Sequence, residues 1–236
     1  MTTIAERRQR LRDVDLYVVT SREHSAGRTS LEVLDACLAA GVRMVQLREK
    51  TLSGDQLRDL AREFRARTRD AGCLLIVNDR VDIALDVDAD GVHLGRGDMA
   101  IEEARKQAPS LLIGASSHDM YSALNAEAAG ADYVNIGPIF PTGTKPEHKV
   151  FLGPEAVGLI GMHLHVPFTC MGGINETNID QVLDGGAQIV ALVTAVTKAD
   201  DIEAAARSLR HRILDHRARI AEMERSGSNP WGLETE

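Results

Sequence analysis

The sequence predicts a single α/β domain, a closed (β/α)₈ TIM barrel with eight parallel strands. Three observations support this fold class: a length of 236 residues, an aliphatic composition with only 3% aromatic residues, and a helix–glycine–strand cassette that recurs along the chain. Barrels of about 250 residues commonly form one domain. Buried parallel strands packed against helices use such aliphatic residues. An open doubly wound sheet is the alternative, but no G-x-G-x-x-G follows the first strand, which favours the barrel.

The cassette accounts for four of the eight strands. Its copies are AAGVRMVQLR at 39–48, DADGVHLG at 88–95, AAGADYVNIG at 128–137 and DGGAQIVALV at 184–193. The glycine ends a helix in a left-handed conformation, and the apolar run after it is typical of a buried strand. The other strands are predicted at 16–20, 73–78, 111–116 and 166–171, with amphipathic helices at 53–71, 100–108, 119–129 and 175–185. Alternation of strand and helix predicts a parallel sheet.

The ends of the chain differ from this repeat. Residues 1–14 form a charged extension that we expect to be helical and polar, and 15–224 form the barrel, closed by a long helix at about 201–224. The tail, 225–236, is polar with Gly and Pro and is predicted to be disordered. No apolar stretch follows the charged start, and no window approaches the ~20 apolar residues of a membrane span. We therefore expect a cytoplasmic protein.

The net charge excludes some classes of partner, and the spacing of the cysteines indicates a structural role for them. A formal net charge of −8 argues against nucleic acid and anionic membranes as partners. The three cysteines, Cys37, Cys73 and Cys170, are far apart without a CxxC pair, and we interpret them as core residues.

Function in such a barrel gathers at the carboxyl ends of the strands. The second strand ends in Gln46-Leu47-Arg48-Glu49-Lys50. Alternation places Gln46, Arg48 and Lys50 on one side, where an amide, a guanidinium and an ammonium reach the barrel mouth. A solvated charge cluster is the alternative interpretation.

Two carboxylates follow neighbouring strands. Asp79 comes after Asn78 at the end of the third strand, and Asp98 follows the fourth. Two carboxylates, completed by water and phosphate oxygens, are a common way to hold Mg²⁺. The alternative is that each Asp caps the helix after it.

The later strands supply phosphate-binding groups. Ser116 and His118 follow the fifth strand, and Thr142-Gly143-Thr144-Lys145 follow the sixth. Gly172-Gly173 ends the seventh strand before Asn175-Glu176-Thr177, which we expect to open a helix, and Val193-Thr194 ends the eighth. Loops seven and eight of such barrels often bind phosphate.

Counting these groups suggests a reaction. Arg48, Lys50 and Lys145 with a metal exceed what one monophosphate needs, and Gly173 with Thr194 would hold a second phosphate. The site is therefore suited to a diphosphate and a monophosphate together, as in a group transfer that expels pyrophosphate.

The ordered motifs VQLREK, VNDR, DGVHLG followed by Asp, GASSH, GPIFPTGTK, GGI and VTAV resemble thiamine phosphate synthase over about 15–210. The resemblance implies coupling of an aminopyrimidine diphosphate to a thiazole phosphate by a Mg²⁺-assisted dissociative displacement. It implies that Gln46, Arg48, Lys50, Asn78, Ser116 and Lys145 bind the diphosphate substrate, that Asp79 and Asp98 hold Mg²⁺, and that Thr142, Thr144, Gly173, Val193 and Thr194 receive the thiazole phosphate. Arg48, Lys50, Ser116 and Lys145 are the catalytic candidates; Leu47, Glu49 and Gly143 complete the substrate-binding set.

Some positions depart from the family pattern. Arg96 replaces a usual Gln, Thr194 replaces a frequent Ser, and TCMGGI replaces a more aliphatic strand, which we interpret as a packing variation. Two other functions stay open: a thiazole tautomerase with His118 as acid or base, and a non-catalytic sensor of a phosphate ligand. The expected partners are small-molecule substrates, and a homodimer is possible.

Overall fold

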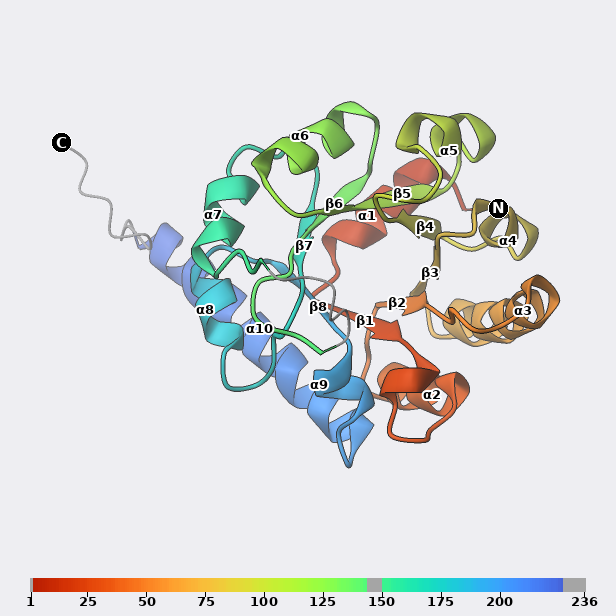
Figure 1. Cartoon of the computed structure of the whole chain (residues 1–236). Helices are drawn as coiled ribbons and strands as arrows, with labels where there is room; N and C mark the ends of the chain where they lie inside the picture. Colours follow the sequence, from red (N-terminus) through yellow and green to blue (C-terminus); the bar gives the residue numbers. More distant parts are fainter. Residues whose placement is uncertain (1, 144–149, 227–236) are drawn as a thin grey trace.

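The computed structural model describes residues 2–143 and 150–226, and its strands form a closed parallel barrel (Figure 1). The strands pair in chain order, and β8 returns to pair with β1. Their bounds are β1 Leu16–Thr20, β2 Met44–Leu47, β3 Leu74–Asn78, β4 Gly91–Leu94, β5 Leu112–Ser117, β6 Tyr133–Ile136, β7 Phe168–Cys170 and β8 Ile189–Leu192. The predicted fold class is confirmed, and each strand lies within its predicted run or extends it by one residue.

Helices surround the barrel. Their bounds are α1 Ile4–Arg12, α2 Ser30–Ala39, α3 Gly54–Asp70, α4 Val81–Asp86, α5 Ile101–Gln107, α6 Met120–Ala128, α7 Glu155–Gly161, α8 Ile179–Asp184, α9 Thr194–Thr197 and α10 Ile202–Arg225, with a short 3₁₀ turn at Arg22–His24. α3 begins where sequence signals predict it, because Ser53 and Gln56 form a reciprocal capping box.

One helix begins later than predicted. The segment from Asn175 was expected to open a helix, but α8 begins only at Ile179. The Asn175 side chain accepts a hydrogen bond from the Thr177 amide, and Asn178 Oδ1 accepts one from the Asn175 amide. These side chains satisfy backbone donors in a turn, which competes with the helix.

The buried residues form two layers. Inside the barrel, a cluster includes Tyr17, Met44, Ile76 and Tyr133, whereas a larger cluster fills the space between strands and helices. Residues two apart on a strand share a face, so one strand supplies both layers.

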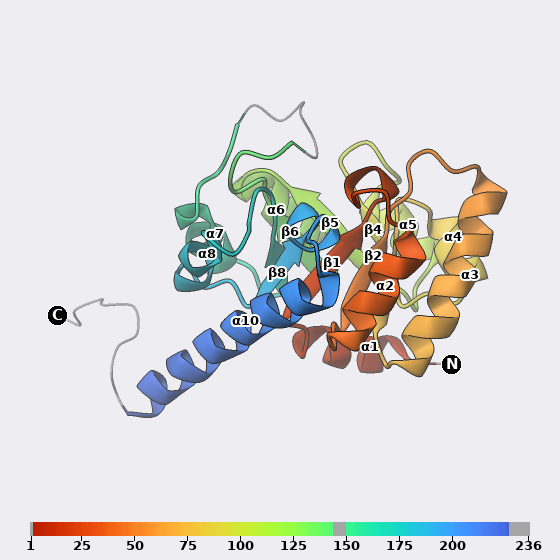
Figure 2. The ribbon, with the colours of Figure 1, turned by 90° about the horizontal axis from the view of Figure 1, so that it is seen from below.

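α1 lies across the amino-terminal end of the barrel (Figure 2). Leu11 and Val14 are buried and belong to the same cluster as the barrel interior. Arg7, only 1% exposed, forms ion pairs with Asp88 and Asp90 on the loop before β4. The residues predicted as a polar extension therefore contribute an apolar face that closes this end of the barrel.

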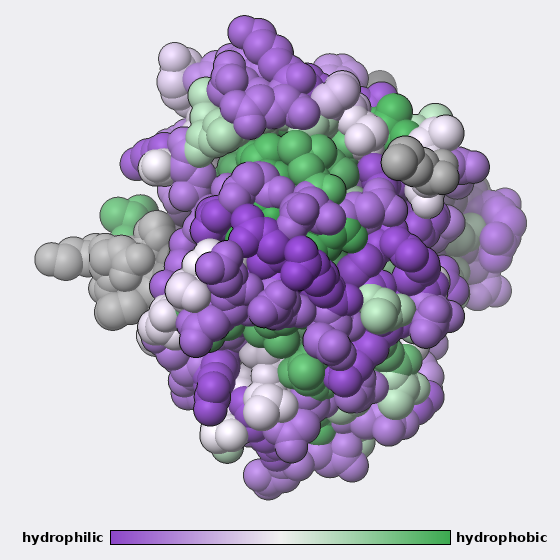
Figure 3. Space-filling model, turned by 90° about the vertical axis from the view of Figure 1, so that its right-hand side faces the viewer, coloured by the Kyte–Doolittle hydropathy of each residue, from purple (hydrophilic) through white to green (hydrophobic). Residues whose placement is uncertain are grey.

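The outer surface is charged. The side of the barrel covered by α3, α4 and α5 is largely hydrophilic (Figure 3). α10 packs against α2 and β1 and extends beyond the barrel (Figure 2). Within 2–143 and 150–226, no helix combines the length and apolarity needed to cross a membrane. Most of the predicted tail, 227–236, lies outside the described residues.

Candidate active site

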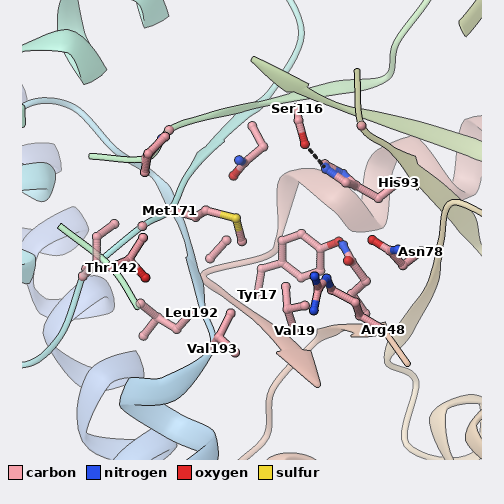
Figure 4. A pocket seen from close by; sticks show the side chains of 18 of the residues that line it. Tyr17, Val19, Arg48, Asn78, His93, Ser116, Thr142, Met171, Leu192 and Val193 are labelled. Carbon is pink, nitrogen blue, oxygen red and sulfur yellow. Dashed lines mark hydrogen bonds between the residues drawn. The ribbon is translucent and has the colours of Figure 1, made fainter. Parts of the chain in front are cut away.

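A cavity of about 290 Å³ opens at the carboxyl end of the barrel. All eight strands or the loops after them contribute to its lining, as expected for a barrel enzyme. Figure 4 shows Arg48, Asn78, His93 and Ser116 toward one side and Thr142 toward the other. The volume suits small molecules.

The end of β2 supplies alternating side chains. Gln46, Arg48 and Lys50 line the cavity, as predicted from alternation. Leu47 packs in the outer core instead. Glu49 turns toward the loop after β1, where it accepts hydrogen bonds from the Arg22 amide (3.1 Å) and the Ser30 hydroxyl. Neither Leu47 nor Glu49 belongs to the lining.

The ends of β3 and β4 bring two carboxylates together. Asn78, Asp79 and Asp98 line the cavity, and Asp79 forms an ion pair with Lys50. Asp79 has a left-handed backbone (φ 62°), and its amide donates to the His93 carbonyl at 2.9 Å. Such a conformation in a non-glycine residue is uncommon and often marks a functional site.

The helix-capping alternative for these carboxylates is wrong. Arg80 and Ala100 occupy the N-cap positions of α4 and α5, and neither helix start has a side-chain cap. Asp98 instead accepts a hydrogen bond from the Gly95 amide at 2.7 Å, within its own loop.

The two carboxyl groups influence each other's protonation. Burial and a hydrogen bond to Asp79 raise the pKa of Asp98. Burial also raises the pKa of Asp79, but hydrogen bonds from Asp98 and Lys50 outweigh it and lower that pKa overall. Two carboxyl groups this close repel each other when both are ionised, unless a cation is shared between them. Their oxygen atoms are the ligands that hard divalent cations prefer.

The fifth strand places a hydroxyl and an imidazole in the cavity. Ser116 Oγ lies 2.9 Å from His93 Nε2 (Figure 4). His118 Nδ1 lies 2.6 Å from the Gly137 carbonyl, beside the start of α6, whose N-cap is Asp119. His93 was not predicted as a site residue. The available signal was its position on a barrel strand two residues after Gly91, because residues two apart on a strand share a face.

The loops after β6 and β7 pack directly on each other. The Ile139 and Phe140 amides donate to the carbonyls of Met171 and Gly172, both at 2.9 Å. A Cβ on Gly173 would lie 2.4 Å from the Pro141 carbonyl oxygen, so this contact requires glycine. The close packing brings both loops to the same side of the cavity.

The predicted phosphate-binding groups are partly assembled there. Gly173, Val193, Thr194 and Thr142 line the cavity, and Thr194 is the first residue of α9. Gly143 is exposed and does not belong to the lining. Thr144 and Lys145 lie outside the described residues.

Two residues that depart from the family pattern differ in where they lie relative to the cavity. Met171 lines the cavity and points into it between Ser116 and Thr142 (Figure 4), so it is more than the packing variation predicted. Arg96 is exposed and is absent from the lining formed by the described residues. Tyr17 and Val19 of β1 also line the cavity and were not predicted.

Comparisons with known proteins find relatives over most of the chain. The family model described as thiamine monophosphate synthase matches residues 16–196. The chain is 46% identical over 198 residues to the thiamine-phosphate synthase of Chloroflexus aurantiacus, covering 84% of this chain and 92% of that protein. It is 43% identical over 201 residues to that of Methanoregula boonei, covering 85% and 93%. The solved thiamine phosphate pyrophosphorylase of Pyrococcus furiosus is 37% identical, with a TM-score of 0.81 over 87% of this chain and 98% of that one.

Proposed function

Because the chain belongs to the thiamine monophosphate synthase family, we propose that its cavity joins an aminopyrimidine diphosphate to a thiazole phosphate and releases pyrophosphate. The observation that carries this proposal is that one cavity holds charged and polar groups at two separate sides. Figure 4 shows Arg48 and Asn78 toward one side and Thr142 toward the other. The carboxylate pair begins directly after Asn78, and Lys50 is paired with Asp79, whereas Gly173 packs on Pro141 in the loop of Thr142. Two separately held anionic groups would place the reacting rings between them.

The first side suits a diphosphate with a divalent cation. The described lining there contains two cations, Arg48 and Lys50, and two carboxylates, Asp79 and Asp98. Since their formal charges cancel, a diphosphate needs further positive charge to bind strongly. Mg²⁺ held by Asp79 and Asp98 would supply that charge and stabilise the leaving pyrophosphate. We propose Lys145, which lies outside the described residues, as an additional cation here.

The second side suits a monophosphate. Backbone amides of Gly173 and Val193, with the hydroxyls of Thr142 and Thr194, would bind its oxygen atoms. We assign Thr144 to the same group by family resemblance. Holding this phosphate fixes the thiazole ring nitrogen near the pyrimidine methylene, and such positioning is a large part of catalysis in bimolecular reactions.

The bond changes need no side-chain nucleophile. The methylene carbon–oxygen bond breaks, and its electron pair leaves with the pyrophosphate. Positive charge on the methylene is shared with the electron-rich aminopyrimidine, and the thiazole nitrogen then donates its electron pair to form the carbon–nitrogen bond. Arg48 and Lys50 stabilise the charge that develops on the leaving oxygen atoms. We propose that Asn78, Gln46 and Ser116 bind the pyrimidine diphosphate.

The alternatives gain less support. A tautomerase using His118 would not need the carboxylate pair, and His118 Nδ1 lies against the Gly137 carbonyl. A sensor would not need to keep the cationic and acidic groups that line this cavity. The curated relatives named above carry the synthase name.

A pyrophosphate-release assay tests the proposal. The protein is incubated with the aminopyrimidine diphosphate, the thiazole phosphate, both or neither, each with Mg²⁺ or with a chelator. We expect release only with both substrates and the metal. Absence of release from folded protein under every condition would refute the synthase function, and release without Mg²⁺ would refute the metal assignment.

A cytoplasmic location, a homodimer and the domain limits 1–14, 15–224 and 225–236 stay predictions.

A further inference from the structure

Beneath the cavity, hydrogen bonds connect β2 to β5 through the barrel interior. Gln46 Nε2 donates to the Tyr17 hydroxyl, which lies 3.1 Å from the Tyr133 hydroxyl. The Tyr133 hydroxyl lies 3.1 Å from His93 Nδ1, and His93 Nε2 lies 2.9 Å from Ser116 Oγ. Tyr133 is fully buried and does not belong to the cavity lining, unlike the other four residues. Any effect of Tyr133 on a substrate must therefore act through its neighbours.

The position of Tyr133 is fixed by close packing. A Cβ on Gly114 would lie 2.0 Å from Tyr133 Cζ, so the ring occupies the space that a side chain at 114 would fill. The Tyr17 ring meets it edge-on, with centroids 6.1 Å apart, and the His93 ring lies 5.6 Å away. Edge-on aromatic contacts at this distance are favourable. The hydroxyl is thus held at one point between Tyr17 and His93.

Each hydroxyl has one hydrogen atom to donate, and this sets the donor and the acceptor of each hydrogen bond in the series from Gln46 to Ser116. The Tyr17 oxygen accepts from Gln46, and among the described residues its other hydrogen-bond partner is Tyr133. The Tyr17 hydroxyl therefore donates to Tyr133, because a buried hydroxyl hydrogen without an acceptor is costly. The Tyr133 hydroxyl in turn donates to His93 Nδ1. A neutral imidazole that accepts at Nδ1 carries its hydrogen on Nε2 and donates it to Ser116 Oγ.

We propose that Tyr133 is a positioning residue that, through His93, orients the Ser116 hydroxyl as a hydrogen-bond donor toward the substrate. The inference rests on the proposed function, which assigns Ser116 to the pyrimidine diphosphate. Since Ser116 Oγ accepts from His93, its own hydrogen is directed to another acceptor. The site then selects a ring that presents an acceptor, such as a pyrimidine nitrogen, and rejects one that presents a donor at that point.

The Tyr133→Phe variant tests this role with minimal structural change, because it removes only the hydroxyl. We expect KM for the pyrimidine diphosphate to rise about five- to tenfold, as for loss of one hydrogen bond. The turnover number and KM for the thiazole phosphate should change less than about twofold. Calorimetric titration with the pyrimidine diphosphate alone should show the same loss of affinity. Tyr121→Phe is the matched control, since Tyr121 is 77% exposed on α6.

A double-mutant cycle distinguishes positioning from general damage. If Tyr133 acts through Ser116, Tyr133→Phe should not weaken binding further in a Ser116→Ala background. An equal loss of affinity in both backgrounds, an unchanged KM in the single variant, or equal increases in KM for both substrates would overturn the proposal. Failure of the wild-type protein to release pyrophosphate, with the calorimetric effect preserved, would refute the proposed synthase function and leave the positioning role supported.

Discussion

Replacement of Asp79 by Asn provides the sharpest test of the metal assignment. Asn matches the size of Asp and is also tolerated in the left-handed conformation that Asp79 adopts, with φ of 62°. The substitution therefore removes a negative charge while keeping the backbone. It also breaks the ion pair with Lys50, whose side chain is 47% exposed while that of Asp79 is 21% exposed. A pair this exposed contributes less than about 1 kcal/mol to stability.

The expected effect on catalysis is much larger. Removal of one of two carboxylate ligands should cost about 3 kcal/mol of transition-state stabilisation, which corresponds to roughly a 100-fold fall in kcat/KM. Pyrophosphate release is measured across a range of Mg²⁺ concentrations, and thermal unfolding is followed in parallel. We expect the half-saturating Mg²⁺ concentration to rise while the unfolding temperature stays within a few degrees, on the order of what 1 kcal/mol produces.

Asp82→Asn is the matched control. Asp82 lies three residues further along, pairs with Arg80, and does not line the cavity. It should keep wild-type turnover and wild-type Mg²⁺ dependence. If Asp79→Asn showed the same kinetics as this control, Asp79 would not be a metal ligand and the interpretation of the carboxylate pair would be refuted.

Three further predictions concern the phosphate site, the amino-terminal helix and the cysteines. Thr194→Val should raise KM for the thiazole phosphate about tenfold through loss of one hydrogen bond to a charged group; an unchanged KM would contradict the assignment. Leu11→Ala should lower the free energy of unfolding in urea by about 2–4 kcal/mol, because Leu11 is 1% exposed within the interior cluster, and a loss below about 1 kcal/mol would show that α1 is dispensable. Burial raises the pKa of Cys37 and of Cys170 to about 12 and raises that of Cys73 as well, so a thiol reagent should label none of them at pH 8 before unfolding; rapid labelling of native protein would contradict their burial.

The sequence was most informative where a local rule has a direct structural consequence. Strand alternation correctly brought Gln46, Arg48 and Lys50 into one cavity, and the loop order correctly brought Asp79 near Asp98. The same rule explains why Leu47 and Glu49 do not belong to the lining. They alternate with Gln46, Arg48 and Lys50, so their side chains face the opposite side and pack outward. Alternation could have excluded both residues from the sequence alone.

Other features depended on contacts between distant segments. The hydrogen-bonded chain through Tyr133 joins residues from β1, β2, β4, β5 and β6, and the space for its ring depends on the absence of a side chain at Gly114. The contact between the loops after β6 and β7 and the inward position of Met171 arise in the same way.

The sequence by itself determined the barrel, the order of its strands, and the end at which polar groups gather, because periodicity and glycine placement act within a few residues. Only the tertiary structure decided that α1 closes the amino-terminal end, that Asp79 and Asp98 lie close enough for each to shift the pKa of the other, and that His93 connects a buried tyrosine to Ser116. The physical reason is that these relations depend on closure of the barrel. Closure fixes distances between side chains that are tens of residues apart along the chain, and no local pattern encodes such distances.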